Sequence, residues 1–142
     1  MANALFDPGR EGFLAGEIDW DTATIKVALV RGYTFNAAHK FVSDVTSAGV
    51  TLVATSAALS GKTITSGVAD AADGTFGTVA TGTACSCIIV FQSSAVTGGT
   101  DVAATAQRLI AYIDTATGLP VTPNGGEITF AFDNGANKIF KL

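Results

Sequence analysis

The sequence predicts a mainly β protein, an antiparallel sandwich or barrel of about seven or eight short strands with one or two short helices. Short runs of alternating apolar and polar residues recur along the 142-residue chain, and glycine-rich breaks such as "VTGGT" separate them. The chain is 48% hydrophobic, much of it Ala and Val, but only 14% charged, and Thr, Ser and Gly fill the positions between. This mixture suits pleated sheets and tight turns better than long helices.

The first twenty residues differ from the rest, because they form a charged, glycine-containing segment with helical character. Asp7 is a suitable N-cap, Pro8 fits the first helical position, and Gly16 can end the helix. A helix of about eight residues with glycines inside it is not stable alone in water, so it must dock on another surface. We therefore expect an arm or short helix over residues 1–20 and a single β domain over residues 21–142.

The β domain divides into elements by the spacing of its apolar residues. In "ATIKVALVRG", the alternation of Ile25, Val27 and Leu29 predicts one face of a strand. The segment "NAAHKFVSDV" has helical spacing behind Asn36, which predicts a short helix over about residues 36–45. Further strand patterns follow over about residues 50–55, 62–68, 75–80 and 84–92.

The last third of the chain carries the clearest strand patterns. The runs "QRLIAYID", "EITFAF" and "KIFKL" each alternate side chains between two faces. The "DNG" between the last two runs predicts a hairpin turn, because Asn and Gly tolerate positive φ angles. We therefore expect these last two strands to pair with each other.

The charge of the chain argues against two classes of partner. Its net charge is −4, and its eight Lys and Arg residues are scattered. Binding to nucleic acid needs a basic stripe that replaces counterions, and binding to an anionic membrane surface needs basic clusters. No apolar run approaches the roughly 20 residues of a membrane span, and Asp7 and Pro8 interrupt any signal peptide. We expect neither nucleic acid nor a membrane as partner.

Both cysteines lie in "ACSCIIVF". On a regular strand, Cys85 and Cys87 would share one face with Ile89 and Phe91, where free cysteine behaves as a small hydrophobic residue. Residues i and i+2 of a strand lie too far apart for a disulfide, and two soft ligands alone do not complete a zinc site. We predict that both are core residues, with a contact to another subunit as the alternative.

The remaining motifs predict no cofactor and no metal site. The run "SGKT" resembles the end of a phosphate-binding loop, but Ser56 stands where its first glycine belongs and a strand follows, so we predict a hairpin turn. The runs "DWD" and "DAAD" offer carboxylates to calcium, yet Ala23 stands where a third ligand belongs. We interpret these carboxylates as solvated turn residues: Asp19, Asp21, Asp70 and Asp73.

The sequence does not favour an enzyme. His39 is the only histidine; it falls on the predicted helix, where we expect it at the surface, and no G-x-S-x-G turn accompanies it. Paired acids can meet in three dimensions whatever their spacing, so an enzyme acting on the cell envelope would use an acid such as Asp19, Asp114 or Asp133.

Two segments, "NALFDPGREGFLAGEIDWDTATIKVALV" and "RLIAYIDTATGLPVTPNGGEITFAFDNGANKIFKL", carry a family resemblance over nearly half the chain. They resemble a family of small virion structural proteins of tailed bacteriophages. Between about residues 32 and 107 the likeness is only one of style, in short Thr/Ala/Gly-rich strands, and "CSC" is not a feature of the family. The resemblance implies a non-enzymatic capsid decoration or cement protein, located in the virion after synthesis in the host cytoplasm.

The resemblance also implies partners. A decoration protein would bridge neighbouring subunits of the major capsid protein and contact other copies of itself, as a homo-oligomer on the particle. Exposed edge strands would add pairing with a capsid loop or with another copy. Cement proteins look like compact β domains with an extended terminus that inserts across a neighbour, so the candidate subunit-contact residues are Leu5, Phe6, Arg10, Phe13 and Leu14. In the alternative, the same amphipathic helix closes one end of its own sandwich.

Two further functions are compatible with the sequence. A tail, collar or fibre module would contact the host surface or a carbohydrate through aromatics such as Trp20, Tyr33 or Tyr112, although single aromatics in a sandwich are more often core residues. A cytosolic phage factor would be absent from the virion.

Overall fold

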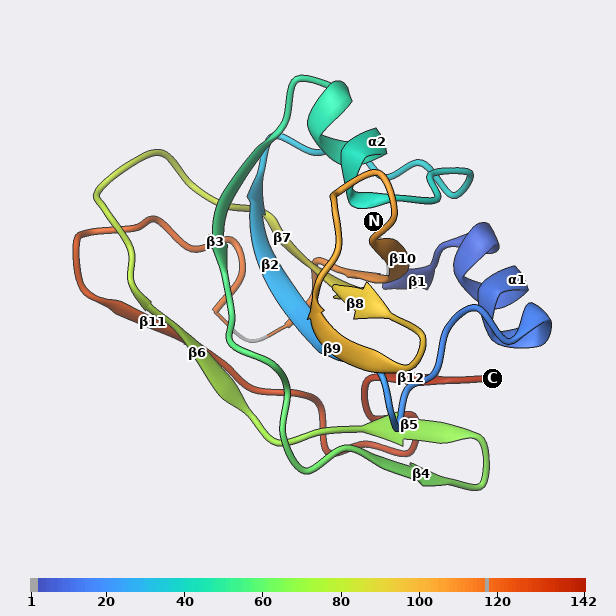
Figure 1. Cartoon of the computed structure of the whole chain (residues 1–142). Coiled ribbons are helices and arrows are strands. Elements are labelled where there is room, and N and C mark those ends of the chain that lie inside the picture. The colour runs from blue at the N-terminus through green and yellow to red at the C-terminus, as the bar shows by residue number, and fades with distance from the viewer. Residues whose placement is uncertain (1–2, 117) are drawn as a thin grey trace.

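The computed structural model describes residues 3–116 and 118–142 and confirms a mainly β, sandwich-like fold (Figure 1). Strands account for 37% of the chain and helices for 11%. Within the described residues, the elements in chain order are β1 (Ala4–Leu5), α1 (Asp7–Ala15), β2 (Ile25–Arg31), α2 (Val42–Ser47), β3 (Thr51–Thr55), β4 (Thr63–Thr65), β5 (Val68–Asp70), β6 (Gly74–Thr78), β7 (Cys87–Gln92), β8 (Ser94–Ala95), β9 (Gly98–Asp101), β10 (Arg108–Ile113), β11 (Glu127–Phe130) and β12 (Phe140–Lys141).

A five-stranded antiparallel sheet with the strand order β1-β10-β7-β2-β3 forms the centre of the fold. Its middle strands β10, β7 and β2 are buried along almost their whole length. Their sequences explain this burial, because apolar residues occupy both faces: in β2, Val27 and Leu29 belong to one core cluster and Ala28 and Val30 to another. Strands of this kind must be covered on both sides.

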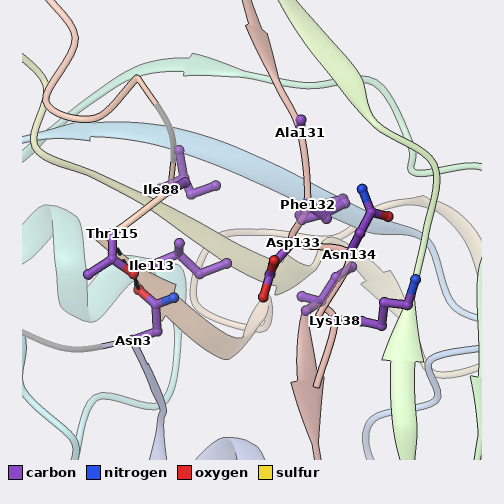
Figure 2. A pocket seen from close by; sticks show the side chains of 11 residues that line it. Asn3, Ile88, Ile113, Thr115, Ala131, Phe132, Asp133, Asn134 and Lys138 are labelled. Carbon is purple, nitrogen blue, oxygen red and sulfur yellow. Dashed lines mark hydrogen bonds between the residues drawn. The ribbon is translucent and has the colours of Figure 1, made fainter. Parts of the chain in front are cut away.

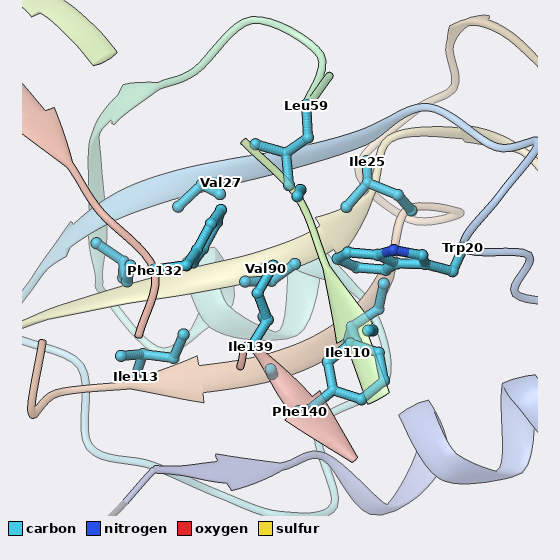
Figure 3. Close-up of a cluster of buried hydrophobic side chains, with 14 of the residues drawn as sticks. Trp20, Ile25, Val27, Leu59, Val90, Ile110, Ile113, Phe132, Ile139 and Phe140 are labelled. Carbon is cyan, nitrogen blue, oxygen red and sulfur yellow. The ribbon is translucent and has the colours of Figure 1, made fainter. Parts of the chain in front are cut away.

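Two small sheets, β12-β5-β4 and β11-β6, cover one face of the central sheet. The larger core cluster lies between these layers, and Figure 3 shows Trp20, Ile110 and Phe140 packed within it. The indole ring of Trp20 meets the ring of Phe140 edge-on, with their centroids 5.2 Å apart. The strands β8 and β9 form a separate hairpin.

Helix α2 and the segment over residues 33–41 cover the opposite face of the central sheet. The ring of Phe35 lies between those of Phe6 and Tyr112, with centroid distances of 5.2 and 5.0 Å. Val42 and Val45 are the buried residues of α2. The sheet is therefore covered by strands on one side and by a short helix and a loop on the other.

The predicted helix over residues 36–45 is wrong in extent, because α2 begins only at Val42 and ends at Ser47. Residues 40–42 are instead extended against the start of β10. The amide of Leu109 donates to the carbonyl oxygen of Lys40 at 2.9 Å, and the amide of Val42 donates to that of Gln107 at 3.0 Å. The Asp44 carboxylate accepts from the amides of Lys40 and Phe41, which fixes the start of the helix there.

The predicted hairpin at "DNG" is also wrong. Strand β11 pairs with β6, and β12 pairs with β5, so the two strands flanking this turn belong to different sheets. The amide of Phe132 donates to the Asp73 carboxylate at 2.8 Å and directs the chain away from β11. The residue with a positive φ in this stretch is Lys138, at 47°.

Two smaller expectations also need correction. The run "SGKT" lies at the end of the connection from β3 of the central sheet to β4 of another sheet, with a bend at Gly61 and Thr63 already in β4, so it is not a hairpin turn. Helix α1 has Phe6 rather than Asp7 at its N-cap position, and Asp7 is its first residue. At its other end the helix stops at Gly16, whose φ of 73° is left-handed, as the sequence predicts.

Candidate contact surface

The N-terminal segment is attached to the edge of the central sheet. Strand β1 pairs with β10, with Ala4 opposite Tyr112 and Leu5 opposite Ala111. The amide of Phe6 continues this ladder by donating to the carbonyl oxygen of Ile110 at 3.0 Å. The side chain of Phe6 is fully buried and that of Leu5 is 8% exposed. Two of the five candidate contact residues are therefore enclosed in this chain's own core.

Helix α1 lies directly on the backbone of β10. A Cβ atom added to Gly9 would lie 2.8 Å from the carbonyl oxygen of Leu109, and one added to Gly12 would lie 2.7 Å from Nη2 of Arg108. Arg108 is buried; its guanidinium forms an ion pair with Glu17 and donates to the carbonyl oxygen of Pro8. The glycines permit the close approach, and Arg108 holds both ends of the helix.

The other three candidate contact residues lie at the surface or partly so. Arg10 donates to the Leu5 carbonyl oxygen at 3.2 Å and to the Asp7 carboxylate at 3.1 Å, and half of its side chain is exposed. Phe13 is partly buried, and its ring lies 5.5 Å from that of Phe140. Leu14 points away from the fold and is 90% exposed.

Leu14 is one of three large hydrophobic residues that are exposed in the described chain; Ile64 (59%) and Leu142 (57%) are the others. A cavity of about 240 Å³ opens beside Ile64 and Leu142, and Phe13, Ile18, Trp20 and Phe140 also line it. We define the apolar patch as Phe13, Ile64 and Leu142; the exposed Leu14 follows Phe13 on α1 but does not line the cavity. The patch joins α1, the β4–β5 hairpin and the end of the chain, three segments far apart in the sequence.

The floor of this cavity is held in place by specific contacts. Trp20 Nε1 donates to the carbonyl oxygen of Asp70 at 3.2 Å, and the amide of Leu142 donates to the carbonyl oxygen of Gly67 at 3.0 Å. A surface supported in this way keeps its shape without a partner, so ordering it on binding costs little entropy.

Asp19 is the charged residue at the rim of the cavity. Hydrogen bonds from Thr22 and from the amide of Asp21 hold its pKa below its usual range, so it is ionised at neutral pH. Asp19 is thus a turn residue, as predicted. Asp70 is not the turn residue that the sequence predicts: it is the last residue of β5 and lies 3.6 Å from the Lys138 ammonium. No group of three metal-binding side chains is found among the described residues.

A second, polar cavity of about 570 Å³ lies between the end of β10 and the segment after β11 (Figure 2). Asn3 and Thr115 lie on one side, and Asp133, Asn134 and Lys138 on the other. The Asn3 side-chain oxygen accepts a hydrogen bond from the Thr115 hydroxyl at 2.8 Å. The Asn134 amide, the Asp133 carboxylate and the Lys138 ammonium, which also faces Asp70, supply donors and acceptors suited to a polar chain such as a carbohydrate or a peptide.

Both cysteines are buried and free, as predicted, but they do not share a face. Cys85 belongs to the larger core cluster and Cys87 to the other. The backbone of Cys85 pairs with that of Val121 in an isolated β-bridge, and β7 begins only at Cys87. The chain between Cys85 and Cys87 is therefore not a regular strand. Burial raises the pKa of Cys87 to about 12 and that of Cys85 above its ordinary value, which keeps both thiols protonated and unreactive.

The three aromatics proposed as a carbohydrate platform are buried, in agreement with the core interpretation: Trp20, Tyr33 and Tyr112. His39 is partly exposed but precedes α2 instead of lying on a helix. Its Nδ1 lies 2.9 Å from the Tyr33 hydroxyl oxygen, so it is tied to a core residue.

Sequence reasoning missed Ile64 and Leu142 as surface residues. The pattern of "KIFKL" gives no signal for an exposed Leu142, because a residue two positions after the buried Phe140 falls on the same face of a strand. Ile64 has no signal either, because its exposure depends on β4 being an outer strand.

Comparison of the chain with protein-family models, with curated proteins and with solved structures gives no match. Among the described residues, neither helix has the length and hydropathy needed to cross a lipid bilayer.

Proposed function

We propose that this protein is a non-enzymatic structural component of a tailed-phage virion that decorates the capsid shell and bridges neighbouring capsid subunits. The observation that carries this proposal is the apolar patch, which presents Ile64 and Leu142 to solvent, together with the exposed Leu14 on α1. Exposed apolar surface that is rimmed by polar residues is typical of protein contact sites. Two of the three segments that form the patch, α1 and the end of the chain, belong to the stretches that resemble phage virion proteins, whereas the β4–β5 hairpin does not.

Such a protein would act by burying apolar surface between capsid subunits. A standard interface buries about 1,600 Å² in total, and repeating it over the symmetry-related sites of a shell stabilises the shell without any single strong contact. Because Leu5 and Phe6 are buried in the chain itself, we assign the contact to the outer side of α1 and the adjacent end of the chain, with Leu14 and Leu142 as its anchors.

The first test is a copy count on purified virions of the encoding phage. The virions are denatured, and this protein is quantified by mass spectrometry against the major capsid protein. A copy number close to that of the capsid protein supports decoration. A few copies per particle would place the protein in the tail or collar, and its absence would refute a virion role.

The second test separates attachment from folding. The double variant Leu14→Asp, Leu142→Asp should lose binding to shells that lack the protein, measured by co-sedimentation, while its melting temperature stays near that of the parent. Thr105→Asp is the matched control, because Thr105 is exposed on the loop before β10, away from the apolar patch. Equal binding by all three proteins would show that the apolar patch is not the contact.

A tail, collar or fibre module that contacts the host surface or a carbohydrate is the second candidate, and the polar cavity favours it. Carbohydrate hydroxyls fit its mixed donors and acceptors, including Asp133, Asn134 and Lys138. Calorimetry with host envelope polysaccharide should then detect binding that Asn134→Ala weakens, whereas the decoration proposal expects no heat of binding.

A further inference from the structure

Strand β4 presents an open sheet edge. It is an outer strand of the sheet β12-β5-β4, and all three of its residues are exposed. It pairs with β5 on one side, and among the described residues no strand pairs with its other side. In Figure 1 it lies at the lower rim of the molecule. The unpaired backbone N–H and C=O groups of such an edge are a template for another strand.

An apolar row runs across this sheet and stops at β4. Phe140 lies opposite Ala69, and Ala69 lies opposite Ile64, so the three side chains share one face. Phe140 and Ala69 are buried, but Ile64 at the end of the row is 59% exposed. A further strand that placed an apolar residue beside Ile64 would extend the row and cover it.

The sequence of β4 is self-complementary. Thr63-Ile64-Thr65 reads the same in both directions, so two copies paired antiparallel about a two-fold axis would place Ile64 opposite Ile64 and Thr63 opposite Thr65. Pairs of β-branched apolar residues and pairs of threonines both stabilise neighbouring strands. A two-fold interface requires that one surface be complementary to itself, which this edge is. The strand also carries no charge that two chains of net charge −4 would bring together.

The lysine beside this strand does not protect it. A lysine at a sheet edge commonly prevents pairing with another chain. The Lys62 ammonium donates to the carbonyl oxygen of Ala23, and the charges of Asp21 and Asp19 act on it there. Lys62 is thus held toward the turn that contains Asp19 and Asp21 by specific contacts.

The two outer strands of the central sheet are less suited to pairing. Strand β1 has two residues and leads directly into α1. Strand β3 is longer, but its pairing with β2 is shifted between Leu29 and Val30, and such bulges twist an edge away from a straight partner.

We propose that a second copy of this chain binds at the β4 edge. The two β4 strands would pair antiparallel about a two-fold axis that passes beside Ile64, so that the β12-β5-β4 sheets of the two copies become one continuous sheet. This inference goes beyond the proposed function and does not depend on it, because every test uses the purified chain. The pairing would cover Ile64, one residue of the apolar patch, but it does not involve Leu14 on α1, so a dimer would present two copies of Leu14.

The first test introduces either a positive or a negative charge at residue 64 and measures association by sedimentation velocity over a range of concentrations. The parent chain should show a concentration-dependent dimer, and Ile64→Lys should shift it to monomer, because two ammonium groups would face each other. Ile64→Glu should do the same, whereas an equimolar mixture of the two variants should restore the dimer. Leu14→Lys, which changes a more exposed residue in the same way, should leave the dimer intact.

The second test detects even a weak dimer by cross-linking. Directly opposite residues in an antiparallel pair have Cβ atoms about 4.5–5.5 Å apart, so Ile64→Cys should form an intermolecular disulfide on mild oxidation. Cys85 and Cys87 are buried and do not compete. Thr51→Cys on β3 is the control and should cross-link much more slowly. Equal or faster cross-linking through Thr51→Cys, or failure of the mixed Ile64 variants to associate, would overturn the proposal.

Discussion

The carbonyl oxygen of Leu109 lies 2.8 Å from the point where Gly9 would carry a Cβ atom, so α1 and β10 touch backbone to backbone. Helix propensity and packing therefore act in opposite directions at Gly9. Alanine in place of glycine favours a helix by about 1 kcal/mol, whereas overpacking a tight contact costs about 1–3 kcal/mol.

We expect packing to prevail, so that Gly9→Ala lowers the free energy of unfolding measured in urea. Glu11→Ala is the matched control, because Glu11 is exposed on the same helix, and it should change stability little. A more stable Gly9→Ala protein would show that α1 can move off β10 without loss.

Shortening a side chain to alanine should have different effects on stability at the two ends of the N-terminal segment. Phe6→Ala removes a fully buried ring and should cost about 3–5 kcal/mol, whereas Leu14→Ala removes an exposed side chain and should change stability by less than about 0.5 kcal/mol. Urea titration of both variants measures the difference. A Phe6→Ala protein as stable as the parent would contradict the inference that Phe6 anchors this segment in the core.

Arg108 should matter much more than the carboxylate that it binds. Its side chain is 7% exposed, whereas that of Glu17 is 56% exposed and can be hydrated when the pair is broken. We expect Arg108→Ala to cost about 2–3 kcal/mol, because it also removes the donor to Pro8 and leaves a cavity, and Glu17→Ala to cost less than about 1 kcal/mol. Equal losses in urea would mean that the ion pair alone carries the effect.

Stability should fall at alkaline pH. Burial raises the pKa of Cys87 to about 12, and it raises the pKa of Tyr112 as well. Above the ordinary thiol pKa of 9.0, the unfolded chain releases protons that the folded chain retains, so the free energy of unfolding decreases as the pH rises.

Urea titrations at several pH values between 8 and about 11 measure this slope. Cys87→Ala should show a shallower slope even though the cavity lowers its stability at every pH. An unchanged slope in this variant would assign the effect to Tyr112 and the other titrating groups.

The strands of the core and the existence of α1 could be predicted because their signals are local. The strand patterns of "QRLIAYID" and of residues 84–92 identify β10 and β7, and Pro8 with Gly16 bounds α1 to within about one residue. The errors arose where distant segments decide the structure. Residues 36–41 have helical spacing, yet backbone hydrogen bonds to the start of β10 hold residues 40–42 extended.

The candidate site was less predictable than the fold, for the same reason. An amphipathic helix looks alike whether it covers its own core or a neighbour, so the pattern of Phe6, Phe13 and Leu14 could not separate the two. The structure shows that the N-terminal segment covers its own core through Phe6, the residue before α1, and that α1 presents Leu14 outward. Ile64 enters the surface only through the order of strands in a small sheet, which no local pattern encodes.

The order of strands in the central sheet also bears on the timing of folding during synthesis. Strand β1 has its partner in β10, about a hundred residues later in the chain. At roughly 5–20 residues per second, the ribosome needs about 5–20 s to make the intervening segment. Throughout that interval Leu5 and Phe6 have no partner strand to dock on, so the nascent chain carries an exposed apolar segment. We therefore expect the nascent chain, but not the finished protein, to be a chaperone client through its first residues.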